Sequence, residues 1–137
     1  MRANWNEIPN DKKARGQWAA LYVTLNPKGR LMMSRVTYER MNEPVAFNVY
    51  FDDVNNLIGL KATALSSRNA FRACRVTPRG GRAVHVYRLI QDYGIRLPQT
   101  IQFEDPDIDQ DGILVLDLRT ARVSERAKNH YKRRGRV

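Results

Sequence analysis

The stretch Lys28-Gly29-Arg30-Leu31-Met32-Met33-Ser34 decides the fold, because a similar pattern returns 52 residues further along the chain. Gly29-Arg30 is matched by Gly81-Arg82, Asn42 by Gly94, and Phe51-Asp52-Asp53 by Phe103-Glu104-Asp105. Each copy predicts a strand, a basic turn that contains glycine, one short helix, and two strands joined by a polar turn. A unit of this size cannot bury its apolar face alone, so we expect two copies to share one core with internal pseudo-symmetry.

Local signals place the elements of the first copy. Ser34 is a good N-cap for a helix over about 35–41, which Asn42 and Pro44 end. The alternation over 45–52 predicts a half-buried strand. The other expected elements of this copy are a strand over 18–26, a basic turn over 26–29, a polar turn over 53–56 and a strand over 57–60.

The second copy follows a connector over 63–69. Gly94 closes its helix, predicted over 85–93, at the left-handed capping position. The other expected elements are a strand over 71–77, a turn over 78–81, and a hairpin of strands over 100–103 and 112–118.

The sequence thus predicts a mixed, β-rich (α+β) fold in one domain, 18–118, with pseudo-symmetric halves 18–62 and 70–118. Residues 1–17 form an N-terminal arm that we expect Trp5 and Ile8 to anchor on the body. Residues 119–137 form a basic tail whose apolar residues lie four apart, as in a helix: Val123, Ala127 and Tyr131. This tail either docks on the body or stays loose until a partner arrives.

The charge is high and unevenly distributed. The formal net charge is +10, with 18 arginines among the 24 basic residues. Residues 67–88 hold six arginines and no acid, residues 89–118 are acidic, and residues 119–137 are again strongly basic. Such blocks create strong local potentials, and arginine is the side chain that forks onto phosphates and base edges. This clustering favours contact with nucleic acid.

Several classes of protein are not expected. The sequence has no apolar run long enough to span a membrane and no signal-peptide pattern, so we expect a cytoplasmic protein with no membrane contact. Cys74 is the single cysteine, which excludes an internal disulfide and favours a partly buried strand residue over a reactive thiol. His85 and His130 lie in different segments, without partners for a triad or a metal site. We therefore expect no enzyme activity, no cofactor and no metal.

The acidic segment Asp107-Ile108-Asp109-Gln110-Asp111-Gly112 resembles the first half of a calcium-binding loop. However, Leu118 stands where a bidentate glutamate is needed, and the flanking residues predict strands instead of helices. A solvated acidic hairpin loop over 105–112 is the favoured interpretation, and cation binding there stays open.

The two basic turns are the best candidate site. Each glycine allows the backbone to approach a phosphate, and each turn places arginine near a helix start. A pseudo-twofold body would place the two turns side by side on one face, as suits the spaced phosphates of a duplex. The predicted nucleic-acid-binding residues are Lys28, Arg30, Arg35, Arg40, Arg75, Arg79, Arg82, Arg88, Arg126, Lys132, Arg133 and Arg134.

The residues from Gly29 to Asn42, followed by one hairpin with the strands Phe47–Asp53 and Leu57–Lys61, resemble the AbrB-like swapped-hairpin family (SpoVT/AbrB). Two copies in one chain are similar to the MraZ-like tandem arrangement. Ser34 stands where that family usually has proline. The resemblance implies two β-α-β-β halves interlaced as a pseudo-twofold swapped-hairpin barrel, with basic residues around the turn and helix binding DNA.

The resulting prediction is a non-enzymatic, DNA-binding, AbrB-like transcription regulator, either a monomer or a homodimer, that binds duplex DNA. Two alternatives stay open. One is an antitoxin-like protein-interaction or structural module whose basic tail binds an acidic protein partner. The other is an RNA-binding protein in which Tyr50, Tyr87 and Tyr131 stack on bases.

Overall fold

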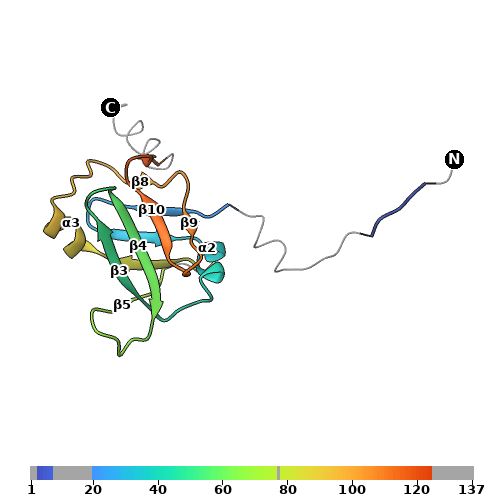
Figure 1. The fold of residues 1–137 in the computed structure, drawn as a ribbon, viewed down its shortest axis with the longest axis horizontal. Coiled ribbons are helices and arrows are strands. Elements are labelled where there is room, and N and C mark those ends of the chain that lie inside the picture. Colours follow the sequence, from blue (N-terminus) through green and yellow to red (C-terminus); the bar gives the residue numbers. More distant parts are fainter. Residues whose placement is uncertain (1–2, 8–19, 77, 125–137) are drawn as a thin grey trace.

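The computed structural model of the chain describes residues 3–7, 20–76 and 78–124. Two antiparallel sheets and two short helices make up this part of the chain, so the mixed, β-rich class is confirmed. Figure 1 shows the two sheets packed face to face, with α2 and α3 at opposite ends of the body. The part of the predicted tail helix after Ser124 and the predicted contacts of Arg126, Lys132, Arg133 and Arg134 lie outside the described residues, as does the anchor Ile8. Val123, the first residue of the predicted helical stripe, lies in a strand instead.

The six-stranded sheet has the order β11-β8-β1-β2-β7-β6. Its strands are β1 (Val23–Leu25), β2 (Arg30–Met33), β6 (Cys74–Arg75), β7 (Arg82–His85), β8 (Ile101–Gln102) and β11 (Arg122–Val123). The centre of this sheet joins the two halves of the sequence, because β2 pairs with β7. β1 pairs with β2 on one side and with β8 of the second half on the other.

The five-stranded sheet has the order β5-β3-β4-β10-β9. Its strands are β3 (Ala46–Asp52), β4 (Leu57–Thr63), β5 (Phe71–Arg72), β9 (Asp107–Ile108) and β10 (Leu114–Asp117). The two halves meet here as well, at the β4–β10 and β3–β5 pairs. Each half of the sequence therefore supplies strands to both sheets.

One end of each helix lies where its predicted capping residue places it. α2 (Arg35–Arg40) begins after Ser34, whose Oγ accepts the Thr37 N–H at 3.3 Å, so the predicted N-cap is confirmed. α3 (Tyr87–Tyr93) ends at Gly94, which has φ +60° and confirms the predicted left-handed cap. His85, however, is the last residue of β7 and precedes this helix.

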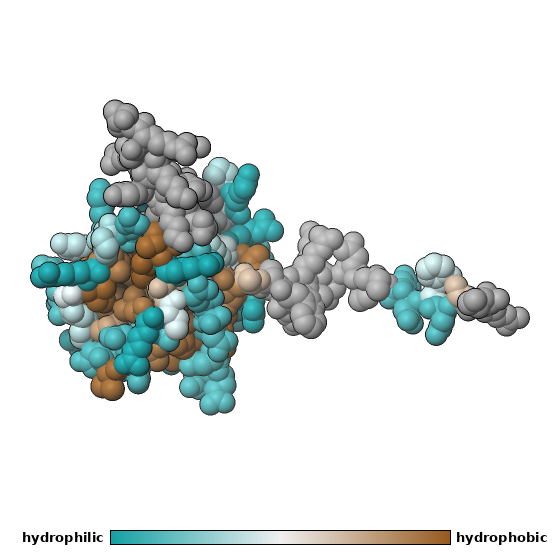
Figure 2. Space-filling model, turned by 90° about the horizontal axis from the view of Figure 1, so that it is seen from above, coloured by the Kyte–Doolittle hydropathy of each residue, from teal (hydrophilic) through white to brown (hydrophobic). Residues whose placement is uncertain are grey.

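The core lies between the two sheets. Its largest fully buried side chains include Phe47, Phe103, Leu31 and Leu60. Because these four residues come from both sheets and both halves, neither half could bury its apolar face without the other. The surface is mixed: seen from above the body, apolar side chains are interleaved with hydrophilic ones (Figure 2).

Four expectations about individual segments are wrong. The predicted hairpin of strands over 100–103 and 112–118 does not form, because β8 and β10 belong to different sheets. Trp5 does not anchor the arm, because its side chain is 89% exposed. The predicted strand over 71–77 is interrupted at Ala73, and its two parts, β5 and β6, join different sheets. The tail does not begin at 119, because Arg122–Val123 forms β11 and pairs with β8.

Candidate nucleic-acid interface

Three of the predicted basic residues meet in one pocket of about 400 Å³. Arg30, Arg35 and Arg79 line this arginine pocket together with polar side chains from several elements, and none of the described residues that line it is acidic. The polar residues of the lining are Tyr22, Thr24, Asn26, Ser34, Thr100 and Ser124. The pocket therefore combines positive charge with hydrogen-bonding hydroxyl and amide groups.

The pocket opens on the face of the six-stranded sheet that points away from the core. Thr24 and Met32, which line it, are directly opposed in the β1–β2 pair. Their neighbours Val23, Leu25 and Leu31 are fully buried in the core, and successive residues of a strand point to opposite faces. Tyr22 and Thr24 alternate with the core residues Val23 and Leu25, so the sequence carried a signal that these two side chains share the outer face of the sheet. Neither residue was predicted from the sequence to be part of a site.

Arg30 enters the pocket from the start of β2. Its backbone N–H donates to Asn26 Oδ1 at 2.8 Å, and the same oxygen accepts the Lys28 N–H at 3.1 Å, which holds the basic turn closed. The Arg30 Nε is buried and has no hydrogen-bond partner among the described residues. A buried donor without a partner is costly, and such a group is commonly completed by a ligand or by water.

Arg35 and Arg79 are brought together by a close approach between the two halves. A Cβ on Gly80 would lie 2.7 Å from Arg35 Cδ and 2.9 Å from Arg35 Cγ, so only glycine fits there without moving that side chain. Gly80 also has φ +95°, which favours glycine. Its neighbour Arg79 is thereby placed beside α2. Arg35 also forms an exposed ion pair with Glu39 at 2.9 Å, and exposed pairs of this kind are weak.

The Thr37 hydroxyl fixes α2 against the start of β1. The Tyr22 N–H donates to Thr37 Oγ1 at 3.0 Å, and that hydroxyl donates to the Tyr22 carbonyl at 3.2 Å. The Thr37 side chain is fully buried. Two backbone groups of Tyr22, the residue directly before β1, are therefore satisfied by one helical side chain, which positions Ser34 and Arg35 at the pocket.

Arg82 does not lie with Arg30. Its guanidinium lies over the ring of the buried Tyr38, 4.4 Å from the ring centroid, and donates to the Gly80 carbonyl at 2.8 Å. These two contacts tie Arg82 to the turn at Gly80 and to the buried Tyr38 on the core face of the sheet. The structure thus places Arg82 in a stabilising position and leaves its guanidinium turned away from the arginine pocket.

The register of the β2–β7 pair explains this difference. Arg30 lies opposite His85, and Met33 lies opposite Arg82. Directly opposed residues share a face, whereas residues three apart on a strand lie on opposite faces. Arg30 and Arg82 therefore face opposite sides of the sheet, although the 52-residue repeat makes them equivalent in sequence. Within these strands a spacing of 53 matches Leu31 with Val84, and both are core residues.

The two basic turns are not side by side, contrary to the expectation. They lie at opposite ends of the β2–β7 pair, since Arg30 and Arg82 begin strands that run antiparallel. Gly29 packs on the start of α3, where a Cβ would lie 2.4 Å from Tyr87 Cα. Each turn therefore contacts the helix start of the other half.

The remaining predicted residues are spread around the body. Lys28 is exposed in the first turn, and Arg40 is exposed in the last turn of α2. Arg75 is exposed on the edge strand β6 and donates to the Pro78 carbonyl at 3.4 Å. Arg88 on α3 pairs with Asp92 at 3.4 Å. None of these four lines the arginine pocket.

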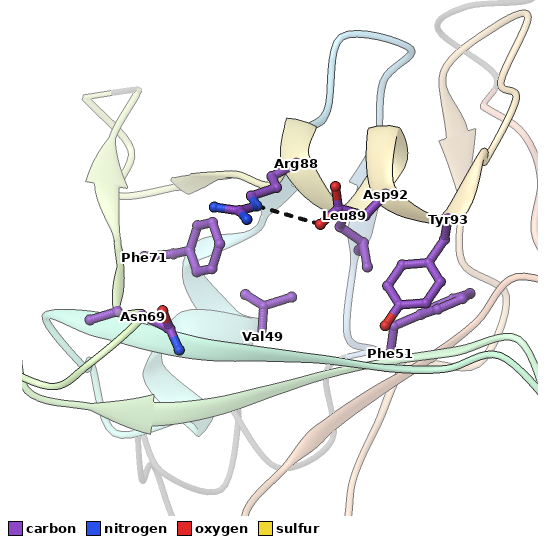
Figure 3. A pocket seen from close by; sticks show the side chains of 9 residues that line it. Val49, Phe51, Asn69, Phe71, Arg88, Leu89, Asp92 and Tyr93 are labelled. Carbon is purple, nitrogen blue, oxygen red and sulfur yellow. Dashed lines mark hydrogen bonds and ion pairs between the residues drawn. The ribbon is translucent and has the colours of Figure 1, made fainter.

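A second pocket of about 390 Å³ lies between α3 and β3 (Figure 3). Figure 3 shows Val49, Phe51 and Phe71 pointing toward Leu89 and Tyr93 of the helix, with the Arg88–Asp92 pair at the rim. The rings of Phe51 and Tyr93 contact each other, with centroids 4.5 Å apart. The residues that line it are mainly apolar.

The acidic loop is a closed hairpin turn between β9 and β10. Asp109 Oδ1 accepts the N–H groups of Asp111 and Ile113, both at 2.9 Å. Among the described residues, no group of three or more histidine, cysteine or acidic side chains is placed to hold a metal ion. Cys74 is free and half-buried, as expected for a strand cysteine.

One carboxyl group has a shifted pKa. The Asn55 side chain donates to Asp52 Oδ2 at 2.9 Å and lowers the pKa of Asp52 below its ordinary value of 3.8. The backbone N–H groups of Asn55 and Val54 and the charge of Arg119 act in the same direction. This side chain caps the β3–β4 turn and lies away from the arginine pocket.

Comparisons with known proteins identify no relative: no protein-family model, curated protein or solved structure matches the chain. None of the helices in the described part of the chain has the length and apolar character needed to cross a membrane.

Proposed function

We propose that this chain is a non-enzymatic protein that binds duplex DNA, with the arginine pocket and its rim as the contact surface. The observation that carries the proposal is that Arg30 of β2, Arg35 of α2 and Arg79 of the turn before β7 line one pocket together with hydroxyl side chains. Arginine and hydroxyl side chains are the usual partners of DNA phosphates. A net charge of +10 adds long-range attraction to a polyanion.

We further propose that the fold is of the AbrB-like swapped-hairpin type, in the MraZ-like tandem arrangement, and that the protein regulates transcription in the cytoplasm. The exchange of strands between the halves supports this proposal. β8 of the second half pairs with the first strand of the first half, and β3 of the first half pairs with β5, the first strand of the second. A swapped hairpin requires such a reciprocal exchange.

A salt titration with a duplex oligonucleotide tests the DNA-binding proposal. Each phosphate contact contributes a slope of about −0.9 to the dependence of log K on log salt. Arg30→Gln, Arg35→Gln and Arg79→Gln combined should reduce the magnitude of this slope by about 2–3 and weaken binding at every salt concentration.

The matched control for this experiment is Arg96→Gln, which removes one exposed charge outside the pocket. It should change the slope by less than about one contact. An unchanged slope in the triple variant would contradict the proposal, because the measured attraction would then come from elsewhere in the chain.

RNA binding is the second candidate function, and the exposure of two tyrosines favours it. The side chains of Tyr50 and Tyr87 are 53% and 57% exposed, and Tyr87 lies against the basic turn at Gly29. Exposed aromatic rings beside positive charge can stack on unpaired bases. Competition between a duplex and a single-stranded RNA of equal length separates the two functions, since preferred RNA binding that Tyr87→Ala abolishes would favour the second.

A further inference from the structure

We propose that the arginine pocket is a binding site for a small free ligand, a nucleoside monophosphate, with its phosphate on Arg30. This inference goes beyond DNA binding and does not depend on it. The positive charge, the size and the depth of the pocket each point to such a ligand.

The arginines define the end that receives the phosphate. Arg30 and Arg79 form no ion pair among the described residues, and the described lining contains no carboxylate. The buried Nε of Arg30 lacks a hydrogen-bond partner in the same part of the chain. A phosphate oxygen in the pocket would accept from the terminal guanidinium N–H groups of these arginines, and charge-assisted bonds between arginine and phosphate are among the strongest in proteins.

The size of the pocket argues for more than a phosphate. At about 400 Å³ it lies within the range of pockets that hold small organic ligands. Met32 and the half-exposed ring of Tyr22 offer apolar contact for a flat base, whereas Thr24 and Thr100 offer hydroxyl groups for a ribose or a base edge. An inorganic anion would leave these contacts unused.

The depth of Arg30 leaves room for a small ligand below the rim that a duplex would contact first. Arg35 and Arg79 are exposed at the rim, whereas Arg30 is half-buried. A duplex presents its phosphates on a convex backbone, so it reaches the rim residues before it reaches Arg30. A small ligand that enters the pocket can contact all three.

The experiment is a titration of the ¹⁵N-labelled full-length protein with adenosine 5′-monophosphate, followed by amide chemical shifts. We expect saturable shifts at Thr24, Met32 and Gly81, with a dissociation constant in the micromolar to millimolar range. Adenosine and inorganic phosphate, titrated separately, should each bind at least about tenfold more weakly, because each uses only one end of the pocket.

Two variants and one control test the residue assignment. Arg30→Gln and Arg79→Gln should each weaken binding by about tenfold or more, as the loss of a charge-assisted contact requires. Arg96→Gln should stay within about twofold, because Arg96 does not line the pocket. Arg79 lies in an exposed turn, so Arg79→Gln leaves the core intact and stays informative if Arg30→Gln fails to fold.

Four results would overturn the proposal that the pocket binds a nucleoside monophosphate. Phosphate that binds as tightly as the nucleotide would reduce the site to a simple anion site and overturn the proposal. Shifts outside the pocket lining, or equal affinities in all variants, would do the same. A 5′-phosphorylated single-stranded oligonucleotide that binds where adenosine 5′-monophosphate does not would assign the pocket to a strand end and overturn it too. Failure of duplex binding alone would leave the nucleotide result unaffected.

Discussion

Replacing Gly29 with alanine should be among the most damaging single changes in the basic turns. Gly29 has φ +82°, and a Cβ built on it would lie 2.4 Å from Tyr87 Cα and 2.6 Å from Tyr87 N. Both neighbours are backbone atoms at the start of α3, so no side-chain rotation relieves the clash. The turn would have to move away from the helix by about 1 Å to reach ordinary contact distance.

The expected cost has three parts. The positive φ costs alanine about 1–2 kcal/mol. Separating the turn from α3 weakens the hydrogen bond from the Val86 N–H to the Gly29 carbonyl, 2.7 Å long, which contributes about 1 kcal/mol. Overpacking against a backbone costs about 1–3 kcal/mol. The free energy of unfolding should therefore fall by about 3–6 kcal/mol, a large part of the usual 5–15 kcal/mol of a domain.

Gly94→Ala is the matched control. Gly94 has a similar positive φ of +60°, but nothing lies within 4 Å of the position that a Cβ would take there. This variant should lose only the conformational part, about 1–2 kcal/mol. Urea unfolding of both variants, analysed as a two-state transition, measures the difference. Equal losses in the two variants would refute the reasoning, because the close approach of the turn to α3 would then contribute nothing.

Three further predictions concern single side chains. Arg82→Met should lower the free energy of unfolding by about 1–2 kcal/mol, through the lost contacts with Tyr38 and the Gly80 carbonyl, and leave the salt dependence of DNA binding unchanged. A loss of affinity without a loss of stability would contradict this assignment. Thr37→Val should cost about 1–3 kcal/mol in urea unfolding, because it leaves the Tyr22 N–H and carbonyl without their partner, and Thr37→Ser should recover part of the loss. Asp52 has a pKa below its ordinary value in the folded state, so its stabilising contribution is present above about pH 3.8 and is lost as the pH falls through the folded pKa. Asp52→Asn should therefore flatten the pH dependence of stability in that acidic window, and an unchanged profile would exclude Asp52 as a source of it.

The sequence correctly predicted those features of the fold that depend only on residues close together in the chain. Ser34 and Gly94 mark the ends of helices because caps act within one turn, and the alternation over 45–52 marks β3 because its faces differ in burial. The charge pattern likewise identified Arg30, Arg35 and Arg79, three of the residues that line the arginine pocket.

Features that depend on distant pairing escaped the sequence reasoning. β11 forms because Arg122 and Val123 find an open edge on β8, and nothing in their own sequence predicts this partner. The strand is similarly interrupted at Ala73 because β5, before this residue, pairs in one sheet and β6, after it, pairs in the other. The polar lining residues Thr100 and Ser124 reach the pocket through the same edge, where the Ser124 N–H donates to the Thr100 carbonyl at 3.0 Å.

The 52-residue repeat shows most clearly that strand pairing, and not the sequence alone, decides which face of the sheet a side chain occupies. Matching Gly29-Arg30 with Gly81-Arg82 is the natural alignment of the letters, yet the β2–β7 register turns Arg30 outward and Arg82 toward Tyr38. Because side chains alternate along a strand, an offset of one residue is enough to turn a side chain from the pocket face of the sheet to the core face. The second half therefore has no counterpart of Arg30 at the same place, and the body carries an asymmetric basic surface although its strands are exchanged reciprocally. A double variant of Arg30 and Arg82 would mix a change of binding with a change of stability, so the two arginines must be tested separately.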